Sequence, residues 1–199
     1  MQSFVQRFSK RKGAAILAAA ALVVCLPLGL RALTHETIYV DGSLAYYSVD
    51  DLFAGSTLVV SGTITGEPES LRVRHASADM ETNFTDYTLA VEHVYRGQAA
   101  GETLTVRIYG GTAGNVTEIY SPAPQLAAGE EYLLFLNQPS MGGAFHTLGD
   151  YYYITGVTQG VFQEGTAGLY TSQSGDTLSP IQLAMTRSVP PVDSDSLRE

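Results

Sequence analysis

The sequence predicts a mainly β protein: a small antiparallel β-barrel with one or two short helices, preceded by a single N-terminal transmembrane or signal helix. Residues 13–30 form an uncharged apolar stretch behind a basic segment. Beyond residue 34, apolar and polar residues alternate with a period of two, which is typical of half-buried strands. Glycine-containing turns separate about six such segments, and a sheet of this size avoids exposed edges by closing or half closing into a barrel.

The amino end is predicted to consist of a cytoplasmic basic segment at 1–12 and a transmembrane signal anchor at 13–33. A helix over residues 13–30 would be about 27 Å long, close to the ~30 Å hydrocarbon core of a bilayer. Four basic residues precede the stretch and Arg31 follows it, which predicts that the N-terminus stays inside and the rest is translocated. The membrane is therefore a predicted partner, and the localisation is the cell membrane, single-pass, with an extracytoplasmic C-terminal domain.

Two alternatives concern processing of this segment. A cleaved signal peptide, followed by secretion, would need small residues before the cut, and sites around Arg31 place Leu30 at the −3 position. A lipoprotein would need a small residue before Cys25, where the sequence has Val24. We therefore interpret Cys25 as an apolar residue of the helix.

Charge divides the chain into two parts. Residues 1–31 hold five basic residues and no acidic one, whereas residues 32–199 hold 6 basic and 20 acidic residues, a net charge of −14. The second part has no lysine and no basic patch, so we predict no nucleic acid partner. A single cysteine excludes an internal disulfide framework and zinc sites built from several cysteines.

The exported part divides into a linker at 34–47, the extracytoplasmic β-barrel domain at 48–187 and a proline-marked disordered tail at 188–199. Within the domain, Leu58–Gly66 is predicted as a strand that ends at Gly-Glu-Pro. Phe84–Tyr95 and Thr103–Tyr109 alternate cleanly and predict a hairpin. Tyr132–Leu136 is apolar on both faces, which predicts a central strand covered on both sides. Further short strands are predicted at Tyr151–Thr155, Gly160–Gln163 and Gly168–Ser172.

Two short helices are predicted. Ser48 is a favoured N-cap for residues 49–54, whose early acidic residues suit the positive end of a helix. Ser179-Pro180 begins the second, because proline is favoured at the first helical position. Its spacing predicts that Ile181, Ala184 and Met185 are buried.

No catalytic residue, metal ligand or cofactor site is predicted. The chain has no Gly-x-Ser-x-Gly motif, and its four histidines lie in separate segments. Asp79–Asp86 is rich in oxygen ligands but lacks the order of a helix–loop–helix calcium site, so we predict a solvated acidic loop. Gly110–Asn115 is predicted as a wide loop rather than a phosphate-binding one, because no lysine follows it.

The distribution of tyrosines in the sequence suggests a binding function. All twelve lie beyond residue 38, and Tyr151, Tyr152 and Tyr153 are consecutive. In a strand, Tyr151 and Tyr153 face one way and Tyr152 the other, so at least one should face water or a groove. Tyrosine offers a rigid ring with a hydrogen-bonding tip, which suits peptides or sugars. We predict these three residues as a candidate binding surface; the alternative is that they only border the core.

The order of segments resembles a group of uncharacterised bacterial membrane-anchored envelope proteins with a small OB-like β-barrel domain. The matching pieces, within about residues 48–172, are Asp50–Leu52 with Leu58–Ile64, Tyr87–Gly97, Val106–Gly111 and Gly129–Leu136. The chain is also distantly similar to netrin-type and metalloprotease-inhibitor barrels. Those depend on an N-terminal cysteine and several disulfides, which this chain lacks. The resemblance implies an OB-like fold and transfers no catalytic residue.

These observations predict a membrane-tethered, non-enzymatic extracytoplasmic β-barrel domain that acts as a binding or interaction module for a protein or peptide at the cell surface. An alternative is an extracytoplasmic hydrolase whose carboxylates or histidine come together only in the fold. A second alternative is a purely structural envelope component.

Overall fold

The computed structural model describes residues 34–74, 80–139, 150–165 and 168–186. Most of these residues lie in β-strands, with two short α-helices, so the predicted mainly β class is confirmed. The predicted cytoplasmic segment at 1–12, the membrane anchor at 13–33 and the tail at 188–199 lie outside the described residues. Among the helices that are described, none has the length and apolar character needed to cross a bilayer.

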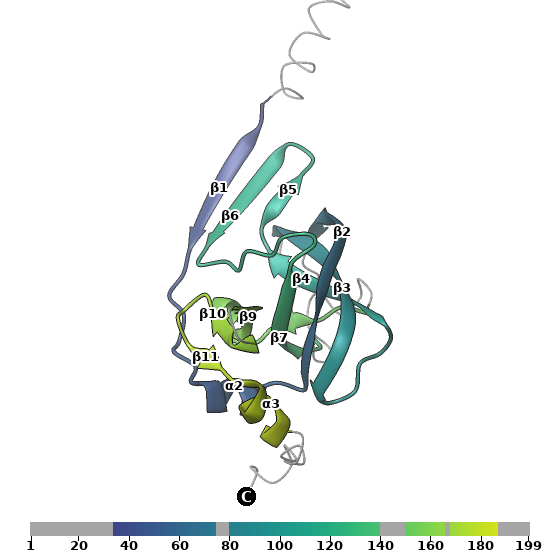
Figure 1. Ribbon diagram of the computed structural model, residues 1–199. Helices are drawn as coiled ribbons and strands as arrows, with labels where there is room; N and C mark the ends of the chain where they lie inside the picture. Colours follow the sequence, from purple (N-terminus) through teal and green to yellow (C-terminus); the bar gives the residue numbers. More distant parts are fainter. Residues whose placement is uncertain (1–33, 75–79, 140–149, 166–167, 187–199) are drawn as a thin grey trace, which may run out of the picture. The chain divides into compact units, whose positions relative to one another are not determined.

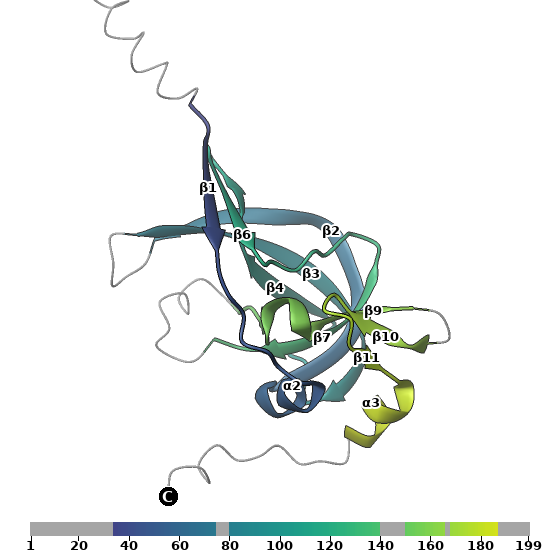
Figure 2. The same cartoon turned by 90° about the vertical axis from the view of Figure 1, so that its left-hand side faces the viewer.

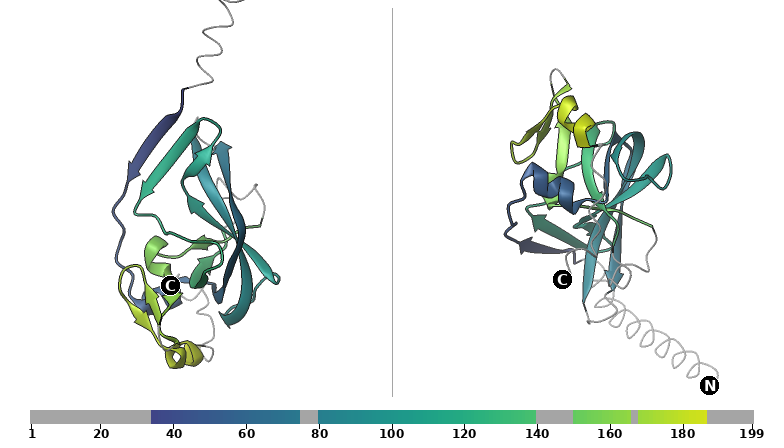
Figure 3. Two further views of the ribbon diagram at one scale, coloured as in Figure 1. Left: turned by 45° about the horizontal axis from the view of Figure 1, so that its top comes forward. Right: turned by 90° about the horizontal axis from the view of Figure 1, so that it is seen from below.

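The main sheet is antiparallel, with the strand order β11-β10-β9-β7-β2-β3-β4 (Figure 1). In addition, β8 pairs with β7. Its strands are β2 (Leu58–Arg74), β3 (Glu81–Arg96), β4 (Thr103–Tyr109), β7 (Glu131–Asn137), β8 (Tyr153–Ile154), β9 (Val161–Glu164), β10 (Tyr170–Ser172) and β11 (Thr177–Leu178). β2 and β3 pair along most of their length and curve together (Figure 3). The predicted hairpin is confirmed as β3 and β4.

β2 is longer than predicted. The sequence prediction ended this strand at Gly66, but it continues to Arg74. The register with β3 shifts between Thr65 and Glu69, so an irregularity absorbs the Gly-Glu-Pro segment without ending the strand. A bulge of this kind tolerates a proline that cannot donate to the ladder.

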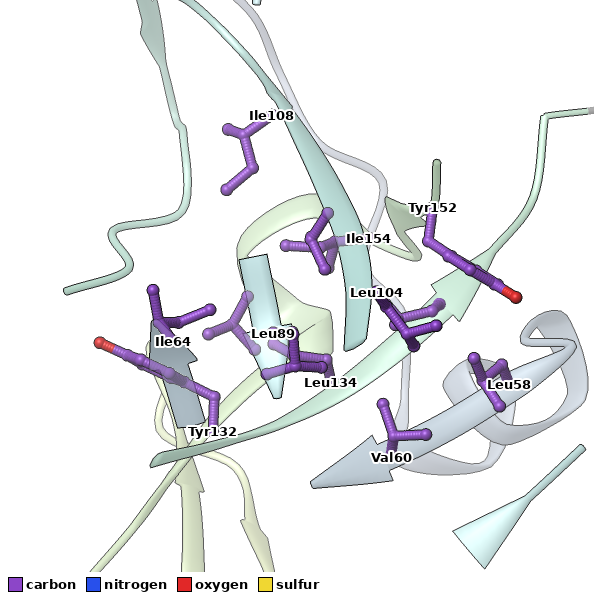
Figure 4. Close-up of a cluster of buried hydrophobic side chains, with 13 residues drawn as sticks. Leu58, Val60, Ile64, Leu89, Leu104, Ile108, Tyr132, Leu134, Tyr152 and Ile154 are labelled. Carbon is purple, nitrogen blue, oxygen red and sulfur yellow. The ribbon is translucent and has the colours of Figure 1, made fainter. Parts of the chain in front are cut away.

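Apolar side chains form two clusters on opposite faces of β7. The first core contains Leu58, Val60, Ile64, Leu89, Leu104, Val106, Ile108, Tyr132, Leu134, Leu136, Tyr152, Ile154 and Val161 (Figure 4). The second core contains Leu52, Phe53, Val59, Leu133, Phe135, Phe162, Tyr170, Leu178 and Leu183. Residues 132–136 alternate between the two and are all buried, which confirms the prediction of a central strand covered on both faces.

Helix α2 (Val49–Gly55) begins as predicted. The Ser48 hydroxyl accepts from the Asp51 amide, and the Asp51 carboxylate accepts from the Ser48 amide, which forms a capping box. The helix then buries Leu52 and Phe53 in the second core. Figure 2 shows α2 and the second helix, α3 (Pro180–Thr186), at the same end of the sheet.

Helix α3 also begins where predicted, but the predicted buried face is wrong. Ile181 is 68% exposed and Ala184 is exposed, whereas Leu183 is fully buried in the second core. The side chain of Met185, the third residue predicted to be buried, lies outside the described part of the structure. The physical reason is the start of the helix: Ser179 and Gln182 form a capping box. This box fixes the entry angle, and Leu178 before the cap and Leu183 after it are buried together as a hydrophobic staple.

A fully closed barrel, one of the two predicted forms, is not found among the described strands. The sheet order leaves β4 and β11 as its two ends. Tyr152 forms one bridge with Val106 of β4, with backbone hydrogen bonds of 2.8 Å to Thr105 and Arg107. Closure by a continuous ladder would need a longer partner strand, and β8 contains only two residues.

A second, three-stranded sheet has the order β1-β6-β5. Its strands β1 (Glu36–Asp41) and β5 (Gly111–Ala113) fall in the predicted linker and the predicted wide loop, so neither strand was expected, and β6 is Val116–Ser121. Residues 34–36 and Gly114–Val116 form a small unit of their own, in which the Glu36 amide donates to the Asn115 carbonyl (2.8 Å). The remaining described residues form the other unit.

Candidate functional site

The three consecutive tyrosines occupy three different environments. Tyr152 points into the first core, and Tyr153 is 42% exposed, as the alternation of a strand predicts. Tyr151 departs from this alternation: it belongs to neither core, yet it is only 5% exposed. The strand begins only at Tyr153, and Tyr151 is buried by a neighbour that sequence analysis did not single out, Arg107.

Arg107 and Asp86 form a buried ion pair on the face of β3 and β4 that points away from the first core. The residues are direct cross-strand partners. Nε and Nη2 of Arg107 each donate to one carboxylate oxygen of Asp86, both at 2.6 Å. Such a two-pronged geometry is the strongest form of this interaction. Burial alone would lower the pKa of Arg107, but the bonds and charge of Asp86 raise it, so the guanidinium stays charged.

Aromatic rings enclose this guanidinium. Its central carbon lies 4.1 Å from the centre of the Tyr151 ring and 5.7 Å from that of Phe84. Cations over aromatic faces at such distances are attracted by the ring, most strongly where water is excluded. Tyr151 is therefore buried against Arg107 and not within a hydrophobic core.

The ring cluster continues outward to solvent. Tyr109 packs against Phe84 with ring centres 4.9 Å apart and against Tyr120 with centres 5.3 Å apart. We call Phe84, Tyr109, Tyr120 and Tyr151 the aromatic face. Tyr109 is its most open member, 52% exposed, although a buried ring supports it from below.

The phenols of the aromatic face keep their protons at neutral pH. Burial raises the pKa of Tyr109 and Tyr151, and the charge of Arg107 only partly offsets it for Tyr151. Burial and the nearby Glu118 carboxylate raise the pKa of Tyr120, whose hydroxyl donates to Glu118 at 3.3 Å. These hydroxyls can donate and accept hydrogen bonds, as recognition of a polar ligand requires.

One donor in this site is unused. Nη1 of Arg107 is buried without a hydrogen-bond partner among the described residues. A buried donor in this state carries a desolvation cost of about 1–3 kcal/mol. Each carboxylate oxygen of Asp86 accepts one hydrogen bond from Arg107, so this carboxylate is engaged in the ion pair.

From Glu81 onward, the acidic segment predicted as a loop is a strand, whereas Asp79 lies outside the described residues. Glu81 begins β3, where it pairs with Arg72 (2.7 Å), and Asp86 pairs with Arg107. Their arginine partners lie on neighbouring strands. The composition of a single segment cannot reveal such long-range pairs. Within the described part of the chain, no three His, Cys, Asp or Glu side chains form a group suited to a metal ion.

The chain matches no protein-family model, and no curated protein is significantly similar to it. The candidate site therefore rests on its geometry. The alternation of apolar and polar residues in 103–109 puts its central residue, Arg107, on the polar face of that strand. The sequence does not reveal the hairpin register that sets Arg107 opposite Asp86, because a seven-residue connection at 96–102 is compatible with more than one register.

Proposed function

We propose that the chain is a membrane-tethered extracytoplasmic binding module, built on an OB-like, half-closed barrel, which recognises a protein or peptide partner through the aromatic face and Tyr153. The apolar stretch at 13–30 with its basic flank supports the tether. The bridge from Val106 to Tyr152, together with the pairing of β8 to β7, supports the half-closed barrel.

The observation that carries the binding proposal is the exposed ring of Tyr109 on a rigid base. Phe84 beneath it is buried, and the neighbouring Arg107 is held by Asp86 and covered by Tyr151. A tyrosine held in this way gives contact area at low entropic cost, and tyrosine is frequent among the residues that dominate binding.

In-cell crosslinking followed by purification of the tagged full chain tests this proposal. We would compare the wild type with Tyr109→Ala and Tyr153→Ala. The matched control is Tyr46→Ala, which removes a tyrosine that is 75% exposed and makes none of these ring contacts. Mass spectrometry should recover a protein with the wild type and the control that Tyr109→Ala loses.

The affinity of the purified partner for the purified wild type and for each variant then gives the size of the loss. Loss of one hot-spot tyrosine weakens binding by roughly tenfold or more. If the wild type and all three variants recover the same proteins in equal amounts, and a thermal melt shows that each variant is folded, the aromatic face is not the recognition surface.

A further inference from the structure

Of the strands that end the described sheets, β1 alone is both long and uncovered. These end strands are β1, β5, β11 and β4 (Figure 1). β5 and β11 have three and two residues, and Tyr152 bridges β4. β1 has six residues, and none of the described residues bridges its outer edge. Such an edge presents unpaired backbone N–H and C=O groups to any chain that can align with it.

The pairing with β6 shows which backbone groups lie on this outer edge. The amides of Glu36 and Gly42 donate to the carbonyls of Asn115 and Ser121, both at 2.8 Å. The two strands advance equally between these bonds, from 36 to 42 and from 115 to 121, so they run parallel without a bulge. Backbone groups alternate in direction along a strand. The residues whose groups point to the outer edge are therefore the odd-numbered ones, Thr37, Tyr39 and Asp41.

β1 lacks the features that usually keep an edge strand from pairing. Proteins protect such edges with lysine, proline, a bulge or a very short strand. The centre of β1 is Thr-Ile-Tyr-Val, which combines β-branched and aromatic residues and carries no charge. Tyr39 is 72% exposed, and Ile119, which the register of β1 and β6 sets beside it, is 42% exposed. The edge is therefore open, and its central side chains are apolar.

An antiparallel copy of β1 complements this edge. Backbone groups that point to the edge must meet groups that do the same, and full overlap then sets Tyr39 opposite its own copy. In this register Thr37 lies opposite Asp41, whose carboxylate can accept a hydrogen bond from the threonine hydroxyl. Ile38 lies opposite Val40, a pair of β-branched side chains. The sequence of β1 is thus self-complementary in the one register that joins the whole edge.

A parallel copy fits less well. Its backbone groups would meet only after a shift by one residue, which breaks the two-fold symmetry of a dimer. It would also bring each Glu36 near its counterpart, and each Asp41 likewise. Antiparallel pairing instead sets Glu36 opposite Gly42, so that no two like charges face each other.

We propose that β1 pairs with β1 of a second copy, antiparallel and centred on Tyr39, so that two three-stranded sheets join across a two-fold axis. An edge of six residues is smaller than a standard interface of about 1,600 Å², so the pairing is weak in free solution. Confinement to a membrane raises the effective concentration, and this part rests on the proposed tether. Both amino ends enter the same membrane when the two-fold axis stands normal to the bilayer.

Disulfide crosslinking of the full chain in phosphatidylcholine vesicles tests the pairing. Cys25→Ala first removes the chain's own thiol, and single cysteines are then introduced. Tyr39→Cys should give a crosslinked dimer on mild oxidation, because residues paired in this way have Cα atoms about 5.5 Å apart, within reach of a disulfide. The matched control is Tyr46→Cys, at a tyrosine that is 75% exposed and lies outside β1. It should give less than about a tenth of that yield.

A mixture of two variants tests the orientation. Thr37→Cys and Asp41→Cys chains with different tags should crosslink to each other. Dimers of either variant with itself should be rare, because like positions lie about 14 Å apart in the antiparallel pair. Adding Tyr39→Pro removes an N–H that points away from β6 and should reduce the mixed dimer about tenfold, whereas Tyr39→Thr keeps this N–H and should retain the dimer.

Equal dimer yields at positions 39 and 46 would reflect chance collision and overturn the proposal. Self-dimers at positions 37 and 41 in place of the mixed dimer, or a mixed dimer that Tyr39→Pro leaves unchanged, would overturn it as well. A thermal melt verifies that each variant is folded. Flotation of the chain with the vesicles checks the tether, and all these variants keep Tyr109 and Tyr153. A failure of the pairing is therefore distinct from a failure of the proposed function.

Discussion

Arg107 is a charged side chain that is almost fully removed from water, and Asp86 makes this possible. Taking a charge out of water is expensive, and the cost is offset only where geometry is good and hydrogen bonds are made. Two bonds of 2.6 Å and the Tyr151 ring at 4.1 Å meet that condition. The pair therefore fixes how β3, β4 and the segment before β8 lie together.

Removing Asp86 should be strongly destabilising, because it leaves Arg107 buried and uncompensated. We expect Asp86→Ala to lower the free energy of unfolding by about 3 kcal/mol or more, measured by urea denaturation. The control Glu67→Ala loses the same charge at an exposed position and should change it by less than about 0.5 kcal/mol. A loss for Asp86→Ala as small as that of the control would contradict the role of the pair.

The raised pKa of Glu131 predicts that the stability of the protein changes with pH in the opposite direction to that expected for a salt-bridged acid. Its pKa is raised in the folded protein, so the folded state favours the protonated form, and this stabilisation is lost as pH rises through the raised pKa. Glu131→Gln should therefore melt near the wild-type temperature in acid and above it at neutral pH. Melting curves over a pH series measure this; a difference that shrinks towards neutrality would contradict it.

Among the elements, the short helix α3 shows how a cap can override a periodic pattern. The spacing of apolar residues alone allowed Ile181 to face inward. The capping box of Ser179 and Gln182 sets a different rotation, and Leu178 and Leu183 are both fully buried in the second core. Seven residues are too few for propensity to stabilise a helix, so the buried leucine must anchor it.

Substitutions on the two faces of α3 should therefore differ. Leu183→Ala should cost about 2–5 kcal/mol of unfolding free energy, because it opens a cavity in the second core. Ile181→Ala removes a side chain of the same size that is 68% exposed and should cost less than about 0.5 kcal/mol. Chemical denaturation of both variants checks this, and the reverse ranking would place the helix in a different rotation.

For the molecule as a whole, the predicted topology has one decisive consequence. If the basic end stays inside, the domain at 48–187 and the chain end after it lie outside the membrane. Protease added to intact spheroplasts should remove a C-terminal epitope tag from the full chain, with a cytoplasmic protein as the intactness control. A tag protected until the cells are lysed would reverse the orientation, and tagged protein released into the medium would indicate cleavage of the signal.

The predicted elements were most accurate where alternation or a cap acts locally. Thr103–Tyr109 was predicted with its observed bounds, and Ser48 caps a helix as expected. The prediction failed where a strand distant in sequence determines the structure. The Gly-Glu-Pro segment does not end β2, because β3 pairs with β2 on both sides of it. Of the candidate surface, Tyr153 is exposed, while Tyr151 is buried by an arginine about forty positions away in sequence.

The sequence by itself determined the strand-rich class, the doubly buried β7 and the division between a basic apolar amino end and an acidic remainder. These properties follow from composition and from periodicity within single segments. Only the tertiary structure decided which charges lie together: Arg107 pairs with Asp86, whereas Glu131 lies opposite Glu164 and forms no ion pair with any described residue. Strand register sets these encounters, and a shift of one residue would turn each side chain to the other face of the sheet.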